Sequence, residues 1–268
     1  MDDPVIELRG ATKRFRGATG GVHTAVRDLT LSVGRGEFVA VVGPTGCGKS
    51  TTLSLVSGLE PPSEGEVLVT GRPVRGIPDG IGYMFQNDAV LPWRSVLDNV
   101  AAGPRYRGSS RAAAREKARG WVGRVGLAGF EKYYPHQLSG GMRKRVALAQ
   151  TLVNEPSILL MDEPFSALDV QTRALMQDEL LRLWSGTGAA VVFVTHDLEE
   201  AVALADRVVV MTASPATVKA SFDIPLPRPR DVEELRLTPE FLDRYREVWD
   251  SLREEVAKSR ERSAQRVA

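Results

Sequence analysis

The residues from Gly43 to Ser50 combine glycine, lysine and serine at a spacing suited to binding phosphate. Their sequence, GPTGCGKS, fits the pattern G-x-x-x-x-G-K-[ST] and directly follows the apolar run 38–42. Glycines in such a loop let backbone N–H groups wrap around a phosphate at the start of a helix, whose dipole favours negative charge. Lys49 would reach the terminal phosphates, and Ser50 would bind Mg²⁺. This stretch therefore predicts a nucleoside triphosphate site.

A pair of carboxylates follows a second apolar run, 158–161. Asp162 and Glu163 stand where a buried strand would end, so we expect both side chains at the carboxyl edge of a sheet. Asp162 is placed to hold Mg²⁺ through water, and Glu163 to polarise an attacking water. Two acidic residues at a strand end are weak evidence for nucleotide hydrolysis when taken alone. In the same chain as the phosphate loop they indicate nucleotide hydrolysis.

A second candidate anion site lies at the run Leu138–Met142, which opens a predicted helix. A serine hydroxyl, two glycine N–H groups and a helix N-terminus form the kind of site that binds phosphate. One nucleotide does not need an anion site separate from its phosphate loop. We therefore expect Ser139, Gly140 and Gly141 to face the γ-phosphate of a neighbouring subunit, in a dimer with two nucleotides at its interface.

Apolar periodicity predicts the elements that must position these residues. Four runs are continuously apolar, as in strands covered on both faces of a mainly parallel sheet; they span 38–42, 158–161, 189–194 and 208–211. Three others alternate like half-exposed strands and span 5–8, 29–33 and 65–69. Because helical stretches separate the apolar runs, the expected fold class is α/β.

The strand signals fade between Gln86 and Glu155, where two stretches, 111–125 and 140–154, are helical in pattern. An all-helical insertion spanning about 87–155 is therefore expected. Three arginines, at 111, 115 and 119, share one face of the first helix. A solvated face is the usual meaning of such a pattern, and contact with a partner or with lipid headgroups is the alternative.

The core domain is expected to end at the proline-stiffened run Pro225–Arg230. This places the core domain, with its candidate nucleotide site, at 1–230 and a helical extension at 231–268. Thr238 and Pro239 are suited to cap and start a last helix. Its apolar stripe, which is more typical of packing on the domain's own surface than of a partner site, comprises Phe241, Tyr245, Val248, Leu252 and Val256. The polar tail from Lys258 is expected to fray.

Composition excludes several classes of protein. The chain has 268 residues, 35 of them basic and 34 acidic, which argues against a general nucleic-acid binder. The longest apolar run, Ala189–Val194, is far shorter than the roughly 20 residues of a membrane helix. The start of the chain is acidic and does not match a secretory signal. The single cysteine, Cys47, fits a reducing compartment. We expect a cytosolic protein that reaches a membrane only through partners.

With these motifs in order, the chain resembles the ATP-binding-cassette (ABC) ATPases over about residues 4–225. Four further positions match family motifs: Gln86 the glutamine loop, Asp169 the D-loop that communicates across the dimer, His196 the switch histidine, and Phe15 the aromatic that stacks on adenine. For Phe15 a place in the core is the alternative, because the loop 17–24 leaves its register open. The resemblance implies a P-loop NTPase core with a mainly parallel sheet, an antiparallel β subdomain and the inserted helical subdomain.

The resemblance also assigns roles. The catalytic residues would be Glu163, His196 and Gln86, and the Mg²⁺ ligands Ser50, Gln86 and Asp162. The ATP-binding residues would be Phe15, Gly43, Pro44, Thr45, Gly46, Cys47, Gly48, Lys49, Ser50, Thr51, Ser139, Gly140, Gly141 and Asp169. The chain departs from the common pattern at Met142, Lys144 and Gln150, which puts fine regulation in question rather than activity. Since the phosphate loop packs on its ligand, we expect alkylation of Cys47 to block hydrolysis and ATP to protect it.

Within the family, the run Phe85–Arg94 is similar to importers of the nitrate, sulfonate and taurine group, as is the motif Pro227–Arg230. The span from Gln86 to Ser139 is too short for the coiled coil of chromosome proteins, and a translation factor would usually carry two cassettes. The resemblance thus implies an ATPase coupled to transmembrane transport, at the cytoplasmic face of the membrane. Its partners would be a second copy, permease subunits and an extracytoplasmic solute-binding protein. The alternatives are an exporter or lipoprotein-release ATPase, or a regulatory ATPase without transport.

Overall fold

The chain forms two compact units in a computed structural model, which describes residues 3–17, 20–87 and 89–267. Unit 1 joins the chain up to Asp79 to the part from Gly188 onward, and unit 2 runs from Gly80 to Thr187. Asp88, within the stretch similar to importers, lies outside the described residues. Unit 2 is therefore an insertion in the sequence of unit 1. The domain boundaries expected from sequence, 1–230 and 231–268, stay a prediction.

Unit 1 contains a four-stranded antiparallel sheet. Its order is β2-β1-β4-β5, with β1 at Ile6–Arg16, β2 at Val22–Val33, β4 at Glu64–Val69 and β5 at Arg72–Pro73. Ile6 lies opposite Val33 on one side and Val69 on the other. The three alternating strands predicted from sequence are confirmed, although β1 and β2 each continue well beyond the alternating core because irregularities in their pairing let a long ribbon bend.

Four further strands of unit 1 lie in the order β10-β9-β3-β8. They are β3 at Phe38–Val42, β8 at Ala190–Val194, β9 at Arg207–Met211 and β10 at Val218–Asp223. β3 runs parallel to both β8 and β9, and every residue of β3 and β8 is buried. The rings of Phe38 and Phe193 lie 5.8 Å apart between centroids. The continuously apolar runs therefore form parallel strands that are buried on both faces, as expected. Strand β10 is antiparallel, half-exposed and polar, and it was not predicted because it has no continuous apolar run.

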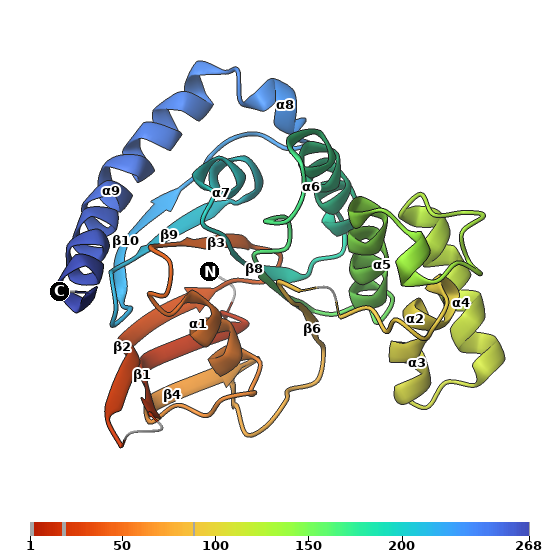
Figure 1. Cartoon of the computed structure of the whole chain (residues 1–268), viewed down its shortest axis with the longest axis horizontal. Helices are drawn as coiled ribbons and strands as arrows, with labels where there is room; N and C mark the ends of the chain where they lie inside the picture. The colour runs from red at the N-terminus through yellow and green to blue at the C-terminus, as the bar shows by residue number, and fades with distance from the viewer. Residues whose placement is uncertain (1–2, 18–19, 88, 268) are drawn as a thin grey trace. The chain divides into compact units, whose positions relative to one another are not determined.

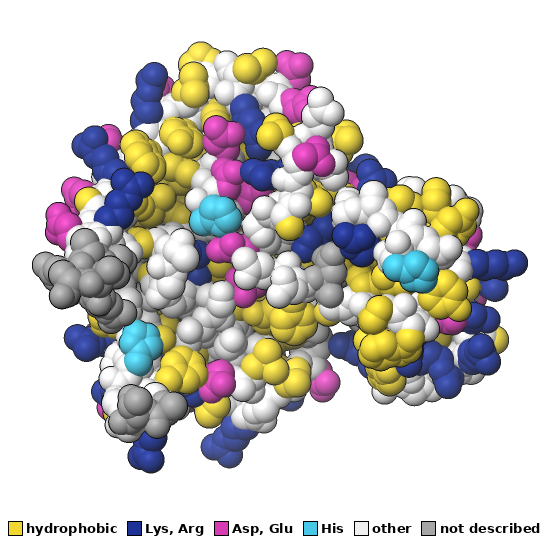
Figure 2. Space-filling view, viewed as in Figure 1, with side chains coloured by type: hydrophobic (Ala, Val, Ile, Leu, Met, Phe, Trp, Pro, Cys, Tyr) yellow, Lys and Arg dark blue, Asp and Glu magenta, His cyan; other side chains and the backbone are white. Residues whose placement is uncertain are grey.

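The helices of unit 1 are α1 at Lys49–Val56, α7 at Leu198–Leu204, α8 at Val232–Leu235 and α9 at Pro239–Val267. α9 packs against α7, β9 and β10, and Figure 1 shows it running beside the two strands. Phe241, Val248 and Leu252 are buried, which confirms the packing role expected for its apolar stripe. Charges of both signs cover its outer side in Figure 2, with ion pairs one turn apart such as Arg244–Glu247.

The expected fraying from Lys258 onward is wrong, since α9 continues to Val267. Two contacts explain the difference. Lys258 pairs with Glu255 one turn earlier, and the guanidinium of Arg262 donates a hydrogen bond to the Ser214 carbonyl. Polar composition alone did not reveal that these side chains tie the helix to itself and to the segment that follows β9.

Unit 2 combines two parallel strands with helices. The strands are β6 at Ile81–Met84 and β7 at Ile158–Asp162. The helices are α2 at Val96–Val100, α3 at Ala102–Tyr106, α4 at Arg111–Arg124, a 3-10 turn at Pro135–Gln137, α5 at Gly140–Leu152 and α6 at Val170–Trp184. Between Asn87 and Glu155 the described residues contain helices and loops only, as expected of the helical insertion.

Two of the three patterned arginines of α4 form ion pairs within unit 2. Arg115 pairs with Asp98 of α2 at 2.9 Å, and Arg119 pairs with Glu116 at 2.8 Å. Both arginines are partly exposed, which agrees with the interpretation of a solvated face. Among the described residues, every helix is too short or too polar to span a lipid bilayer.

Candidate functional site: a nucleotide-binding cassette

The phosphate loop of unit 1 connects the buried strand β3 to α1. Lys49, the first residue of α1, is 5% exposed, and its ammonium donates hydrogen bonds to the carbonyls of Gly43 (2.9 Å) and Pro44 (3.2 Å). The Cys47 N–H donates to the Pro44 carbonyl at 3.2 Å. The loop is therefore closed on itself around a buried cation at a helix N-terminus, which is the chemistry that binds phosphate.

Gly48 shows why the loop requires glycine at this position. Its φ is 129°, a backbone conformation that residues with a side chain rarely adopt. A Cβ there would lie 2.7 Å from the Ala25 carbonyl oxygen and 3.0 Å from the Ala216 Cβ. Gly46, with φ of 73°, meets nothing within 4 Å of such a Cβ. The two glycines are thus constrained differently, Gly46 by its backbone alone and Gly48 by both backbone and packing.

The remaining loop residues divide into exposed and buried groups. Thr45, Gly46 and Ser50 are exposed, and Thr51 is half-buried. Cys47 is buried, and burial raises the pKa of its thiol above the ordinary value. A thiol must ionise to react with an alkylating agent, so this environment opposes the alkylation expected from sequence and predicts a slow reaction.

His196 emerges beside the phosphate loop within unit 1. β3 and β8 are parallel neighbours, with Val41 opposite Val194, so the residues that follow each strand reach the same edge of the sheet. His196 is exposed there. Next to it, Asp197 caps α7 by accepting hydrogen bonds from the backbone N–H groups of Glu199 and Glu200. The fold thus holds the backbone around His196 and leaves its side chain exposed.

Phe15 lies near the end of β1, opposite His23, and is half-buried. The Lys13 ammonium stands over its ring, 5.1 Å from the centroid, and also pairs with Glu60. The ring is therefore neither fully buried in the core nor fully exposed. Its expected stacking on adenine stays a prediction.

In unit 2, Gln86 and Glu163 meet just beyond the ends of β6 and β7. Met84 lies opposite Met161 in these parallel strands, so the residues that follow the two strands lie at the same edge of the sheet. The Gln86 amide donates a hydrogen bond of 3.2 Å to the Glu163 carboxylate, although the residues are 77 positions apart. Glu163 has a φ of 43°, an uncommon conformation for a residue with a side chain. Strained residues of this kind cluster at functional sites.

Asp162 is the last residue of β7 and is half-buried, as expected of a strand-end carboxylate. Burial, with the Asp162 carboxylate nearby, raises the pKa of Tyr83 well above its ordinary value. Tyr83 therefore stays protonated near neutral pH. Asp162 thus lies in a partly desolvated position, where its charge is screened less than at an open surface.

Sequence reasoning missed the role of Lys144. The family pattern marks it only as a departure, yet it is 3% exposed and its ammonium donates a 2.9 Å hydrogen bond to the Gln86 carbonyl. A buried lysine on α5 thus holds the loop that presents the Gln86 amide. The available signal was a long cation in the middle of an otherwise apolar helix face, where lysine is rare unless it has a partner.

The run Ser139–Met142 forms the N-terminus of α5. The Ser139 hydroxyl caps the helix by accepting a hydrogen bond from the Met142 N–H at 3.2 Å, and Ser139 and Gly140 are exposed. A Cβ on Gly141 would lie 2.7 Å from the Thr172 side chain. Thr172 in turn donates its N–H to Asp169, which caps α6. Close packing on α6 therefore contributes to the glycine requirement at 141, alongside any anion binding.

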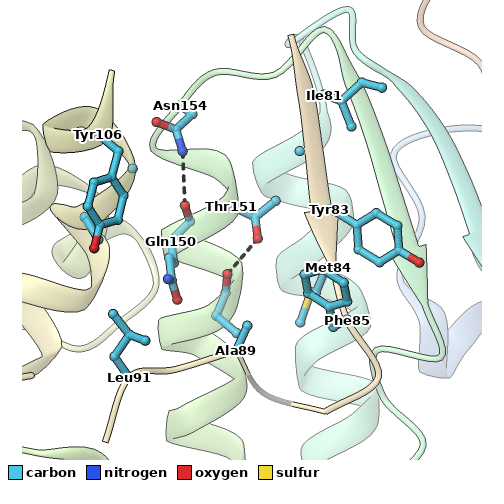
Figure 3. Close-up of a pocket in the computed structure, with 14 residues that line it drawn as sticks. Ile81, Tyr83, Met84, Phe85, Ala89, Leu91, Tyr106, Gln150, Thr151 and Asn154 are labelled. Carbon is cyan, nitrogen blue, oxygen red and sulfur yellow. Dashed lines mark hydrogen bonds between the residues drawn. The ribbon is translucent and has the colours of Figure 1, made fainter. Parts of the chain in front are cut away.

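A groove of about 350 Å³ opens in unit 2. In Figure 3, β6 and Phe85 form one side, α5 the middle, and Tyr106 of α3 the other side. Tyr106 is 75% exposed and accepts a hydrogen bond from Arg94 at 3.1 Å. Gln150, another departure from the family pattern, lines the groove. Aromatic walls around an open, mixed polar and apolar floor are suited to a protein segment rather than to an enclosed small molecule.

The donor groups expected to hold Mg²⁺ are the Ser50 hydroxyl, the Asp162 carboxylate and the Gln86 amide. All three offer oxygen atoms, which is the ligand type that Mg²⁺ prefers. Among the described residues there is no cluster of three or more His, Cys, Asp and Glu side chains that could hold a metal alone.

Comparisons with known proteins find ATP-binding proteins of transporters among the relatives of this chain. An uncharacterized ABC transporter ATP-binding protein of Methanocaldococcus jannaschii is 45% identical over 95% of this chain and 93% of its own length. A taurine import ATP-binding protein of Burkholderia thailandensis is 42% identical over 90% and 93% of the two chains. An aliphatic sulfonates import ATP-binding protein of Bacillus cereus is 38% identical over 84% and 88%.

A solved structure gives the same fold. It is a dimeric, post-hydrolysis ATP-binding cassette bound to ADP and Pi, which matches 83% of this chain and 100% of its own with a TM-score of 0.73 and 31% identity. It confirms the expected α/β cassette with an antiparallel sheet, a mainly parallel sheet and helices. The sequence model of the family described as ABC transporter matches residues 26–166. The chain belongs to the ABC transporter family of ATP-binding proteins.

Proposed function

We propose that this chain is the ATP-hydrolysing subunit of an importer, working as a pair with a second copy and driving a separate permease. The observation that carries the catalytic part is the hydrogen bond from the Gln86 amide to the Glu163 carboxylate. It holds a carboxylate in a strained backbone at a strand end, next to Asp162, where a water could be oriented for attack.

ATP binding is assigned to unit 1. The backbone N–H groups of the phosphate loop and the Lys49 ammonium bind the β- and γ-phosphates, and the ring of Phe15 stacks on adenine. In binding ATP, the Lys49 ammonium exchanges its bonds to loop carbonyls for bonds to phosphate oxygens. Ser50 and Asp162, with Gln86, would hold Mg²⁺, which when bound neutralises phosphate charge. The buried position of Lys49 supports this assignment, because a buried cation gains most from an anionic partner.

Hydrolysis is assigned to Glu163, His196 and Gln86. Gln86 orients the Glu163 carboxylate and the attacking water, and Glu163 accepts the water's proton as its oxygen bonds to the γ-phosphorus. The bond from that phosphorus to the β–γ bridging oxygen breaks, which yields ADP and phosphate. His196, exposed at the edge of the sheet, donates to a γ-phosphate oxygen. The loss of the γ-phosphate then removes the charge that keeps two copies closed.

A second copy completes the site. Ser139 and Gly141 of one copy face the γ-phosphate bound by the other, with Asp169 near the same interface. The exposed N-terminus of α5 supports this arrangement, because the first N–H groups of a helix need an anion, a cap or solvent. Solved cassettes of similar fold, described as dimeric, support it as well.

A permease segment is proposed to occupy the groove of unit 2 (Figure 3). The groove shares β6 and Phe85 with the loop that presents Gln86, so a segment seated there would move with that loop. This offers a physical route from the nucleotide to the membrane. The relatives that import taurine or aliphatic sulfonates support an importer of small organic sulfonates or related anions, supplied by an extracytoplasmic solute-binding protein. The chain would then sit at the cytoplasmic face of the membrane.

The test is a pull-down of tagged Glu163→Gln protein, with ATP, from membranes of the source cells. A variant that binds ATP without turnover should trap the closed complex, and mass spectrometry should identify a multi-span permease and a solute-binding protein. The matched control is Lys49→Ala, which should not form the closed complex because it lacks the ammonium group that binds the phosphates. Recovery of only soluble or nucleic-acid partners would overturn the transport assignment and leave the ATPase chemistry standing.

A further inference from the structure

The C-terminal helix α9 carries one buried carboxylate within its apolar face. Glu255 is 2% exposed, although its neighbours on that face, Val248 and Leu252, are the apolar residues expected to pack there. Burying an ionisable group costs free energy unless it is paired and hydrogen-bonded. The partners of Glu255 therefore indicate what this position does.

Glu255 has three partners, all in unit 1. Its carboxylate accepts a hydrogen bond from the Ala213 N–H at 2.9 Å and pairs with Lys258 at 2.7 Å and Lys219 at 3.2 Å. Burial raises the pKa of Glu255, but the bonds from Lys258, the Ala213 backbone and Lys219 together hold it below its ordinary value. Glu255 is thus a charged group that is bonded to the backbone of Ala213, outside α9.

Ala213 belongs to a tight turn, Thr212–Thr217, that follows β9. The Thr212 N–H donates to the Thr217 carbonyl at 3.0 Å, and the Thr212 hydroxyl donates to the Pro215 carbonyl at 3.0 Å. A second contact from α9 reaches the same turn, where Arg262 donates to the Ser214 carbonyl. The turn is therefore stiffened internally and fastened to α9 at two neighbouring residues.

The opposite side of this turn lies against the phosphate loop. Ala216 exchanges backbone hydrogen bonds of 2.9 Å with Ala25 and Arg27 of β2. A Cβ on Gly48 would meet Ala216 at 3.0 Å, and a Cβ on Gly43 would meet Met211, the last residue of β9, at 3.2 Å. The first and last glycines of the loop thus both touch the segment that runs from β9 into the turn.

We propose that Glu255 is a positioning residue for nucleotide binding, which holds the turn Thr212–Thr217 against the phosphate loop from α9. Glu255 touches no part of the loop itself; it acts through the Ala213 N–H. Without the carboxylate, this buried N–H would lack its partner and the turn would shift toward solvent. The backbone around Gly43 and Gly48 would then lose a packing surface on which its phosphate-binding geometry depends. The inference rests on the proposed binding of nucleotide at this loop.

The test measures the Kd of a fluorescent ATP analogue for the full chain and four variants. Glu255→Ala removes the acceptor, and Glu255→Asp keeps the charge but draws the carboxylate back from Ala213. Glu255→Gln loses the charge but keeps an oxygen that can accept the Ala213 N–H. Glu254→Ala, the control, removes an exposed carboxylate that pairs with Lys219 but does not contact the turn. Unfolding midpoints are measured for each variant.

Reach to Ala213, rather than charge, should set affinity. We expect Kd to rise about tenfold in Glu255→Ala and Glu255→Asp, equivalent to about 1.4 kcal/mol, and to stay near wild type in Glu255→Gln and Glu254→Ala. Wild-type Kd in Glu255→Ala and Glu255→Asp, whatever their unfolding midpoints, would overturn the inference. So would weaker binding by Glu255→Gln than by Glu255→Asp, which would assign the effect to the ion pairs. If Glu255→Ala does not fold, the Kd values of Glu255→Asp and Glu255→Gln decide whether the inference holds. A wild-type chain that binds no nucleotide would instead refute the proposed function.

Discussion

The phosphate loop of unit 1 and the Gln86–Glu163 pair of unit 2 are built in different ways. The loop is one continuous run of residues whose proposed phosphate binding would depend on backbone N–H groups and glycine conformations, with Gly48 at a φ of 129°. The pair joins residues 77 positions apart through side chains, and a buried lysine on a third element holds it in place. The phosphate loop should therefore tolerate almost no change of backbone conformation, whereas the Gln86–Glu163 pair depends on individual side-chain contacts. Substitutions in the loop should therefore reduce nucleotide affinity, whereas substitutions around the pair should reduce turnover.

The largest effect is expected from Gly48→Ala. The added methyl carbon meets the Ala25 carbonyl at 2.7 Å in a conformation that alanine rarely adopts, so the loop must distort. We expect nucleotide affinity to fall more than about 100-fold, equivalent to about 2.8 kcal/mol. The matched control is Gly46→Ala, which has a positive φ but open space and should lose far less. Equal losses in a nucleotide titration would show that packing against Ala25 and Ala216 does not matter.

A smaller and different effect is expected from Lys144→Ala. The Gln86 carbonyl loses its buried donor, so the amide should orient Glu163 less well, while the phosphate loop is untouched. We expect ATP turnover to fall about tenfold with little change in nucleotide Kd. Lys144→Gln keeps a donor and should recover part of the rate. The control Lys117→Ala removes an exposed lysine that pairs with Glu155 and should leave turnover unchanged. A change in Kd without a change in turnover would contradict the tethering role.

The smallest effect concerns the ion pair between Asp98 and Arg115, which joins α2 to α4 in unit 2. The hydrogen bond from Arg115 lowers the pKa of Asp98 below its ordinary value. A lowered pKa stabilises the fold above the ordinary pKa of aspartate, and this contribution is lost as the pH falls through the lowered value. Asp98→Asn should therefore reduce unfolding free energy at pH 7 by less than about 1 kcal/mol, since the pair is partly exposed.

Urea unfolding at several pH values checks this prediction. The difference between Asp98→Asn and wild type should shrink on acidification below about pH 4 and approach zero when Asp98 is protonated in both states. Glu116→Gln, which breaks the exposed pair with Arg119, should have a still smaller effect. A difference that grows with acidity would show that Asp98 is not stabilised as its ionised form.

The sequence predicted the phosphate loop and its flanking elements well, because local rules fix them. The run 38–42 is continuously apolar and became a fully buried strand, and Lys49 begins the helix that follows the glycines. Contacts between distant residues were less accessible. The bond from Lys144 to Gln86 depends on how α5 packs beside the end of β6, which no local pattern encodes.

Glu255 was missed for a related reason. Apolar periodicity identified the face of α9 that packs inward, but a carboxylate on that face is indistinguishable by pattern from one at its border. Only the placement of the Ala213 N–H and two lysines around it explains its burial. Glu163 shows the opposite case. Its position after β7 suggested the role proposed for it, whereas its positive φ could not be foreseen, because glutamate has no preference for that conformation.

The central claim is that Glu163 is the base of an ATPase whose nucleotide is bound by other residues. Steady-state ATP hydrolysis by Glu163→Gln, measured together with nucleotide Kd, tests it most directly. Glutamine preserves the size of the side chain and its contact with Gln86 but cannot accept a proton. We predict that turnover falls more than about 100-fold while Kd stays close to wild type. Near-normal turnover in this variant would contradict the account and assign proton transfer to another group.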